Sequence, residues 1–525
     1  MSGTNHEAKH MRTERKTDVR NGVKRLIFVV LALIVQIGWL MLSLIGLGQK
    51  AAWLSEAVHI LSLALVLLIY GKRTNAGFKL PWIILIMVFP LLGLVLYTFM
   101  GQQNATRATR KRFEEIDEKL MPYLQQDEET AVLAKRRGGR CSHLSGYLLH
   151  GCGYPIYDGT KITYYDDAAK ALEAQLSALE SAKKFIFLEY HAIEDGESFA
   201  RIREVLARKA KEGVDVRLFY DDIGSIGFIT GDFIKRMEAY GIRTRVFNPV
   251  RPIFHIFMNN RDHRKITVIN GKIGFTGGYN LANEYFHLTE PSGYWKDTGI
   301  RMEGPGVRTL TILFLEMWNA INRDDIDDAS FGEFFTEPVD KQQSEGFVQP
   351  YADSPLDNEP AGENVYISVL NEASDYAWFC TPYLLITDEM TRALSLAAQR
   401  GVDVRILTPG IPDKKLTYHL TRSYYAALAR NGVRIFEYTP GFNHAKMCVS
   451  DDAVATVGTI NMDYRSLYLH FENGVVLYDM PPVQEIRKDF EDMFQVSTEV
   501  TYKYSNRSSV MRLGQCILRL LAPLM

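Results

Sequence analysis

Apolar residues are concentrated in three long stretches near the N-terminus of the chain. Each stretch is close to the roughly 20 residues that a helix needs to cross a bilayer, so each predicts a transmembrane helix. The expected segments are residues 26–47, 53–70 and 80–100 within a membrane region of residues 26–105, which a basic polar tail of residues 1–25 precedes. The first segment exceeds the apolar core of a signal peptide and no A-x-A site follows it, so an uncleaved anchor is expected.

The side of the membrane on which the remaining chain lies depends on the number of true spans. Three spans place the basic tail and the basic loop at residues 71–79 on one side, and the positive-inside rule then puts the C-terminal part outside the cytoplasm. Two spans put that part in the cytoplasm, which the basic residues after Met100 and a set of reduced cysteines favour. The pattern predicts a multi-pass protein of the cell membrane and leaves both arrangements open.

From about Gly151 onward, short apolar runs alternate with amphipathic stretches, as is typical of βα units. The run at residues 184–190 predicts a buried strand, residues 198–212 predict a helix, and residues 213–220 predict the next strand. The fold class is therefore expected to be α/β.

This plan occurs twice in the chain. The pentapeptide GVDVR stands at residues 213–217 and again at 401–405, and in each case an apolar run and a helical stretch precede it. Such self-similarity predicts two copies of one domain. We expect the copies at residues 140–339 and 364–500, joined by a polar linker with three prolines at residues 340–363. An amphipathic segment at residues 501–525 is expected to dock on the membrane or on the preceding body.

Each copy also contains a His-x-Lys pair and, seventeen positions after the histidine, an asparagine. These residues are His263, Lys265 and Asn280 in the first copy and His444, Lys446 and Asn461 in the second. Alternate residues of a strand share a face, so each histidine and its lysine project together. Two copies brought together gather two imidazoles, two ammonium groups and two amides around one centre. That set suits a phosphodiester, which needs positive charge, a nucleophile and an acid.

Each histidine is further expected to have a carboxylate partner that fixes its tautomer. Within the same copy, the candidates are Asp297 for His263 and Glu472 for His444. No metal or other cofactor is expected, because the lysines supply the positive charge.

Composition narrows the alternatives. The net charge of −2 argues against a nucleic-acid partner, because such proteins usually carry a basic domain. The five cysteines show no metal-type spacing, which favours reduced thiols over a disulfide framework or a zinc site. The H-e-x-x-H pattern at residues 6–10 lies in the polar tail without a third ligand and is not interpreted as a metal site.

The paired motifs resemble the HKD signature of the phospholipase D superfamily, H-x-K-x4-D-x6-G-[GS]-x-N. Further stretches resemble the bacterial cardiolipin synthases within it: residues 94–101, 185–190, 220–225, 247–249, 283–285, 295–298, 381–383 and 463–466. The resemblance covers nearly everything from about residue 50 onward. It implies two duplicated αβα domains of the phospholipase D type that share one active site behind transmembrane helices.

The resemblance also implies a reaction. A phosphatidyl group would pass from one phosphatidylglycerol to another through a phosphatidyl-histidine, without a metal, giving cardiolipin and glycerol. By the family's usual assignment His263 is the nucleophile and His444 the acid and base, with Lys265, Lys446 and Asp451 completing the catalytic motif. Asn280 and Asn461 would bind the substrate phosphate.

The chain departs from the family pattern at two positions. Thr459 replaces Gly or Ser but keeps a small hydroxyl residue, and Asn270 stands where the pattern has Asp. Asn270 lies five positions after Lys265, an odd offset on one strand, so it is expected to point away from the histidine and lysine. We expect it to accept hydrogen bonds that hold the turn at residues 270–272, and we expect the first motif to remain functional.

Three other functions share parts of this pattern. A phospholipase D that hydrolyses lipids or exchanges other head groups carries the same motif, and the apolar segments disfavour a nuclease. A non-catalytic lipid-binding derivative is supported by Asn270 and opposed by the four intact His and Lys positions. Fold alone does not decide among them.

Overall fold

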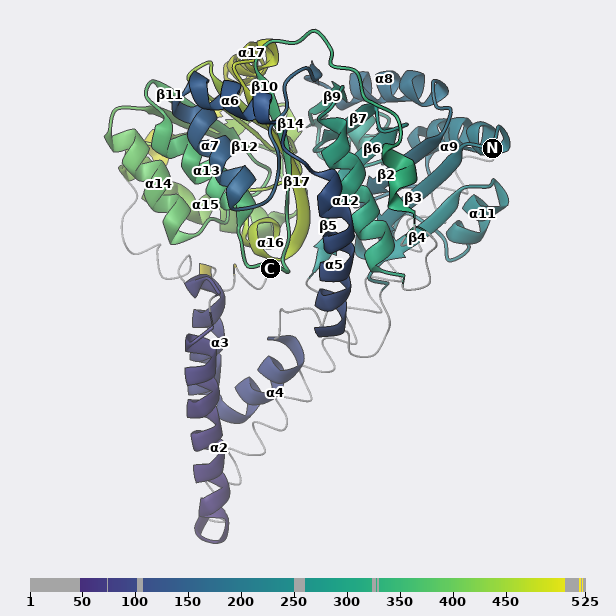
Figure 1. Cartoon of the computed structure of the whole chain (residues 1–525). Helices are drawn as coiled ribbons and strands as arrows, with labels where there is room; N and C mark the ends of the chain where they lie inside the picture. The colour runs from purple at the N-terminus through teal and green to yellow at the C-terminus, as the bar shows by residue number, and fades with distance from the viewer. Residues whose placement is uncertain are drawn as a thin grey trace, which may run out of the picture.

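The computed structural model describes residues 48–72, 74–101, 107–249, 260–322, 327, 330–505, 519–520 and 522. Within these residues two large β-sheets lie side by side, and helices cover them (Figure 1). The predicted α/β class is confirmed.

The first sheet has the strand order β1-β9-β7-β6-β2-β3-β4, in which β2, β3 and β4 are parallel to one another. Its strands are β1 (Lys161–Tyr165), β2 (Phe185–Tyr190), β3 (Asp215–Asp221), β4 (Arg243–Phe247), β6 (Lys265–Ile269), β7 (Ile273–Gly277) and β9 (Gly299–Glu303). Its helices are α8 (Ala168–Glu180), α9 (Glu197–Lys211), α10 (Asp222–Ser225), α11 (Phe233–Ala239) and α12 (Val307–Ala320). All six residues of β2 are buried, because helices cover both faces of the sheet.

The second sheet repeats this order as β10-β17-β16-β15-β11-β12-β13, with β18 added at the edge. Its strands are β10 (Phe347–Asp353), β11 (Tyr376–Cys380), β12 (Asp403–Pro409), β13 (Arg434–Tyr438), β15 (Met447–Ser450), β16 (Val454–Gly458), β17 (His470–Tyr478) and β18 (Ser497–Glu499). Its helices are α13 (Ala361–Glu372), α14 (Asp388–Gln399), α15 (Lys415–Arg430), α16 (Tyr464–Tyr468), α17 (Pro481–Gln495) and α18 (Thr501–Ser505). The same strand order in both sheets confirms the predicted duplication.

The prediction that residues 340–363 form only a linker is wrong. Residues 347–353 form β10, which pairs antiparallel with β17 along its whole length, and α13 begins at Ala361. Proline is tolerated on an edge strand, where one side of the strand makes no ladder hydrogen bonds. Pro350 therefore sits inside β10 and is no mark of a linker.

Three helices precede the sheets. They are α2 (Gly48–Tyr70), α3 (Ala76–Val88) and α4 (Pro90–Met100), and they pack on one another and project from the body (Figure 1). The expected single helix over residues 80–100 is instead two helices, because Pro90 has no amide hydrogen to continue α3 and becomes the first residue of α4. Ile69, Trp82, Ile86 and Tyr97 form the small core between the three helices.

Among the helices that the structure describes, we find none with both the length and the apolar character needed to span a membrane. Residues 1–25 and the first apolar segment, 26–47, lie outside the described residues.

A set of short helices connects α4 to the first sheet: α5 (Arg107–Leu120), the 3-10 turn η1 (Met121–Tyr123), α6 (Glu128–Arg137) and α7 (Gly139–His150). At the other end of the chain, Arg519 donates to the Ser423 carbonyl and lies 4.3 Å from the Tyr424 ring centre, and Ala522 is buried. These contacts agree with docking of the C-terminal segment on the body. The rest of residues 506–525 lies outside the described residues.

Candidate active site

Two short strand pairings join the sheets at their centre. Strand β5 (Arg261–Asp262) pairs in parallel with the start of β17, and β14 (Gly441–Asn443) pairs in parallel with β8 (Tyr294–Lys296). Each pairing joins the segment before a motif histidine to a strand of the other copy. The backbone N–H of His263 donates to Phe471 (2.9 Å), and that of His444 donates to Lys296 (2.7 Å).

These pairings place each histidine beside a carboxylate from the other copy. His263 Nδ1 lies 2.9 Å from Glu472 Oε2, and His444 Nδ1 lies 2.6 Å from Asp297 Oδ2. The two predicted carboxylates are therefore in the site, but the predicted pairing within each copy is wrong. The register explains the exchange, since Glu472 follows the residue opposite Asp262, and Asp297 follows the residue opposite Asn443.

Both carboxylates are fixed by further hydrogen bonds. Glu472 accepts from the hydroxyls of Ser466 (2.7 Å) and Thr459. Asp297 accepts from the backbone N–H of Thr298 (2.8 Å), and Gly278 packs so closely on it that a Cβ there would lie 2.1 Å from Oδ1. Gly278 and Thr459 occupy the same motif position in the two copies. Gly278 leaves room for Asp297, whereas Thr459 donates a hydrogen bond to Glu472.

The carboxylates set the tautomers of the imidazoles. A carboxylate accepts the Nδ1 hydrogen, which leaves Nε2 of each neutral imidazole free to attack or to take a proton. Burial lowers the pKa of both His263 and His444 well below the ordinary value, and the charges of Lys265 and Lys446 lower it further. Each lysine acts on both imidazoles, so the four groups form one electrostatic unit.

The two lysines are buried beside the histidines, with about 1% of each exposed. Lys265 Nζ donates to the His263 carbonyl (2.6 Å), and Lys446 makes the same bond to His444. Burial lowers the pKa of Lys265 to about 8 and that of Lys446 to about 7. A desolvated ammonium group gains from an anionic ligand, so this arrangement suits a phosphate.

The motif asparagines lie in the same buried region. Asn280 donates from Nδ2 to the Tyr285 hydroxyl (2.8 Å) and accepts from the Ala192 N–H (3.1 Å). Asn461 is buried, and its Oδ1 has no hydrogen-bond partner among the described residues. Their role in binding phosphate stays a prediction.

Asp451 lies away from the chemistry. It adopts a left-handed conformation (φ 50°) in the turn after β15 and accepts from the backbone N–H groups of Ser374 (2.6 Å), Asp375 (2.9 Å) and Tyr376 (2.7 Å). Arg140 also pairs with it. The expectation that Asp451 belongs to the catalytic set is therefore wrong, because its carboxylate is directed at the loop before β11 and fixes that loop.

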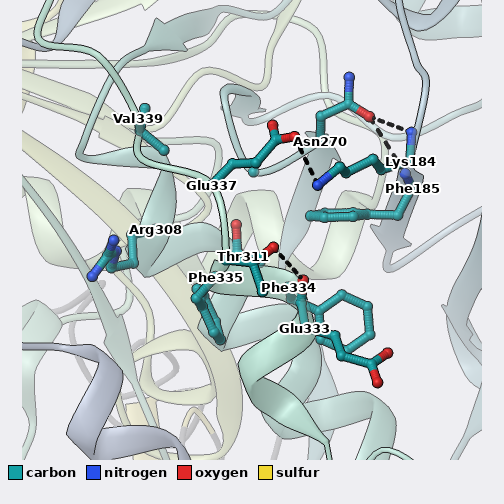
Figure 2. A pocket seen from close by; sticks show the side chains of 12 residues that line it. Lys184, Phe185, Asn270, Arg308, Thr311, Glu333, Phe334, Phe335, Glu337 and Val339 are labelled. Atoms are coloured by element: carbon teal, nitrogen blue, oxygen red, sulfur yellow. Dashed lines mark hydrogen bonds and ion pairs between the residues drawn. The ribbon is translucent and has the colours of Figure 1, made fainter.

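Asn270 performs the corresponding task in the first copy. Its φ is 53°, and its Oδ1 accepts from the backbone N–H groups of Lys183 (3.1 Å), Lys184 (2.9 Å) and Phe185 (3.4 Å). Figure 2 shows it at the edge of a pocket that contains none of the motif histidines or lysines. The prediction that Asn270 points away from the His/Lys face and holds the turn is confirmed.

This geometry predicts a small effect of restoring the acid. An Asn270→Asp protein should change the activity by less than about tenfold, equivalent to about 1.4 kcal/mol, because either side chain offers the acceptor oxygen. Asn270→Ala removes this acceptor at a position with φ 53°, a left-handed conformation that alanine adopts less readily than asparagine, and should lower the free energy of unfolding by about 1–2 kcal/mol. Lipid product analysis and thermal unfolding measure the two effects. If the natural protein is inactive and the Asn270→Asp protein is active, Asn270 instead silences the site.

Several residues around the imidazoles escaped the sequence reasoning. The ring centre of His191 lies 4.8 Å from that of His263, and the ring centre of His470 lies 5.5 Å from it. His444 is surrounded instead by aromatic rings at 5.2–5.9 Å, namely Tyr285, Trp295 and Phe442. His191, His470 and Phe442 belong neither to the repeated spacing nor to the stretches that resemble the synthases, whereas Tyr285 and Trp295 lie in two of those stretches, at residues 283–285 and 295–298.

Among the described residues, the arrangement of His263, His470 and Glu472 is compatible with a metal ion. The Glu472 oxygens already accept the hydroxyl hydrogen bonds of Ser466 and Thr459. Independence from metal stays a prediction.

Comparisons with known proteins agree with this geometry. A family profile described as "Cardiolipin synthase, PLD-like domain" matches residues 176–294 and 366–494, and one described as "Phospholipase_D-nuclease N-terminal" matches residues 60–102. The fold is shared with a phosphatidylserine synthase of Haemophilus influenzae, at a TM-score of 0.54 and 15% identity over 71% of this chain and 94% of that one.

Sequence relatives extend over most of the chain. An uncharacterized protein of Streptococcus mutans is 41% identical over 88% of this chain and 99% of its own length. A cardiolipin synthase of Halalkalibacterium halodurans is 31% identical over 87% of this chain and 91% of its own length. Cardiolipin synthase 1 of Bacillus anthracis is 31% identical over 89% of this chain and 93% of its own length. The chain belongs to the cardiolipin synthase family of the phospholipase D superfamily.

Proposed function

We propose that the protein joins two phosphatidylglycerol molecules into cardiolipin and glycerol through a phosphatidyl group held on His263, without a metal ion. As a cardiolipin synthase it is a phosphatidyl transferase that acts on phospholipids at a membrane. The observation that carries the finer proposal is the pair of carboxylate-bound imidazoles, His263–Glu472 and His444–Asp297, with a buried lysine beside each.

In the first step, Nε2 of His263 attacks the phosphorus and the bond to the glycerol oxygen breaks. With the anionic phosphate bound, His444 carries a second proton on Nε2 as an imidazolium paired with Asp297, and it gives that proton to the glycerol oxygen, so glycerol leaves as an alcohol. In the second step, His444 takes a proton from a hydroxyl of another phosphatidylglycerol. That oxygen attacks the phosphorus, the bond to His263 breaks, and cardiolipin is released. Lys265 and Lys446 balance the phosphate charge throughout.

The surroundings of the imidazoles support this division of roles. His263 lies beside two further histidines, His191 and His470, and burial lowers the pKa of its own imidazole, which suits a neutral nucleophile. His444 lies among the rings of Tyr285, Trp295 and Phe442, whose centres are 5.2–5.9 Å away, and an aromatic surrounding of this kind suits an imidazolium. When the environments of two titratable groups differ in this way, one group commonly acts as the acid and the other as the base or nucleophile.

The membrane arrangement is also part of the proposal. Helices α2 and α3 expose large apolar side chains, among them Trp53 (68%), Leu68 (68%), Met87 (59%) and Val88 (60%). Together with the apolar segment at residues 26–47, they would form a multi-pass anchor below the catalytic body. The body would comprise one domain at residues 140–339 and a second that, with β10, begins near residue 347 and ends near residue 500.

The proposal is tested by the lipid products of the purified full-length protein. Given phosphatidylglycerol vesicles in EDTA, it should release glycerol and cardiolipin in equal amounts, because the lysines supply the charge that a metal would provide. Mass spectrometry of the lipids and an enzymatic glycerol assay measure both products. Loss of activity in EDTA that a divalent ion restores would refute the metal-free mechanism. Phosphatidic acid as the main product would identify a hydrolase.

A further inference from the structure

We propose that His191 recognises the second hydroxyl of the glycerol head group of the acceptor lipid, and so selects a polyol over a simple alcohol or water. The inference rests on the proposed function. In this role, His191 distinguishes the intended acceptor from other hydroxyl compounds that reach the phosphatidyl-histidine.

One nitrogen of His191 is already committed. The residue follows the last residue of β2, and its Nδ1 lies 2.7 Å from the backbone carbonyl of Asp262. A carbonyl only accepts, so Nδ1 carries the hydrogen of the ring. Neutral His191 therefore has a bare Nε2, which is an acceptor. Burial is the main reason why the pKa of His191 lies well below its ordinary value, and this keeps the ring neutral.

The ring is held in one place beside the nucleophile. Its centre lies 4.8 Å from that of His263 at an angle of 65° between the ring planes. Gly224 packs on it so closely that a Cβ there would meet the His191 Cδ2 at 2.9 Å. The side chain is only half-buried, and the structure gives Nε2 no hydrogen bond among the described residues. An acceptor atom is thus held beside the reacting histidine with no donor from the part of the chain that the structure describes.

The other histidine beside His263 differs in this respect. His470 Nε2 lies 3.4 Å from Arg465 Nε, which donates to it, and its Nδ1 faces Glu472 Oε1 at 3.5 Å. Both nitrogens of His470 therefore face protein groups. His470 is a positioning residue for Glu472, whereas His191 has an acceptor available for substrate.

The second copy has no equivalent of His191. Tyr190 lies opposite Lys265 in the first sheet, and the register of β11 with β15 puts Thr381 opposite Lys446. Pro382, which has no polar side-chain atom, then takes the place of His191. The free acceptor thus breaks the symmetry of the duplicated site beside the phosphatidyl-bearing His263.

The chemistry of the acceptor fits this group. The glycerol of phosphatidylglycerol carries two neighbouring hydroxyls, and only one of them attacks the phosphorus. The other has a hydrogen to donate, and water or a simple alcohol lacks this second group. A neutral hydrogen bond contributes about 0.5–1.5 kcal/mol, which corresponds to a preference of about three- to tenfold for a diol.

The test compares two acceptors that differ by one hydroxyl. The full-length protein in detergent–phosphatidylglycerol micelles is given either 1,2-propanediol or 1-propanol, and kcat/KM is measured for each phosphatidyl alcohol formed. The natural protein should favour the diol by about three- to tenfold. His191→Phe and His191→Leu should bring the ratio close to one, and His191→Gln, which keeps an acceptor oxygen, should retain most of it. His470→Gln is the matched control and should lower both rates in the same proportion.

A natural protein without preference for the diol would overturn the inference, as would a ratio that survives in the Phe and Leu variants. Both results leave cardiolipin formation from phosphatidylglycerol intact and so differ from failure of the proposed function, in which the natural protein forms no cardiolipin. Both His191→Phe and His191→Leu are tested, so that poor folding of one of them does not decide the outcome.

Discussion

Replacing His263 or His444 by alanine should each abolish nearly all cardiolipin formation. Loss of a general acid and base alone costs about 10²–10⁴-fold, and loss of the nucleophile costs more. Both imidazoles are buried and bonded to a carboxylate through Nδ1, so alanine removes both the reacting Nε2 and the hydrogen bond that orients it. The rate of cardiolipin formation from radiolabelled phosphatidylglycerol measures the loss.

The two variants should differ in what they trap. The His444→Ala protein still has the nucleophile, so acid-labile phosphatidyl-enzyme should accumulate on His263, and peptide mapping after rapid quenching locates it. His143→Ala is a suitable control, because His143 is largely exposed and its ring pairs with Glu372, away from the motif histidines. Phosphatidyl-enzyme on His444 in the His263→Ala protein would reverse the assigned roles.

The repeated spacing was enough to identify the reacting groups. His263, Lys265, His444 and Lys446 converge because each pair stands at the same point of a repeated strand plan, and local patterns carry that information. The turn role of Asn270 followed from its odd offset on a strand for the same reason. Such inferences depend on residues that are close in sequence.

Other features depended on contacts between distant segments. The exchange of Asp297 and Glu472 is set by β5 with β17 and β14 with β8, and no spacing within one copy encodes which copy supplies the partner. Strand β10 was not predicted, because Pro350 and its polar neighbours disfavour a strand locally. Its pairing with β17 outweighs that local propensity. The break between α3 and α4 does have a local signal, namely Pro90. The uniformly apolar character of residues 80–100 nevertheless predicted one continuous helix.

The exchanged carboxylates lead to a test with a large expected effect. Glu472→Gln and Asp297→Asn should each lower cardiolipin formation by about 10²–10⁴-fold, because an amide donates toward Nδ1 and favours the tautomer with hydrogen on Nε2. The corresponding change in a serine-protease triad costs about 10⁴-fold. Glu472→Gln should prevent attack by His263, since its Nε2 would no longer be a free nucleophile. Asp297→Asn should instead impair proton transfer by His444.

A substrate with a better leaving group separates the two effects. p-Nitrophenol leaves without a proton, so phosphatidyl-p-nitrophenol should restore the first step in the Asp297→Asn protein but not in the Glu472→Gln protein. The burst of p-nitrophenol measures that step, and thermal unfolding checks that both variants are folded. The opposite pattern, with the burst retained in Glu472→Gln and lost in Asp297→Asn, would mean either that each carboxylate serves the histidine of its own copy or that His444 is the nucleophile. The trapping experiment on the His→Ala variants distinguishes those two explanations. With His263 established as the nucleophile, a burst retained only in Asp297→Asn assigns each step to a carboxylate from the opposite copy.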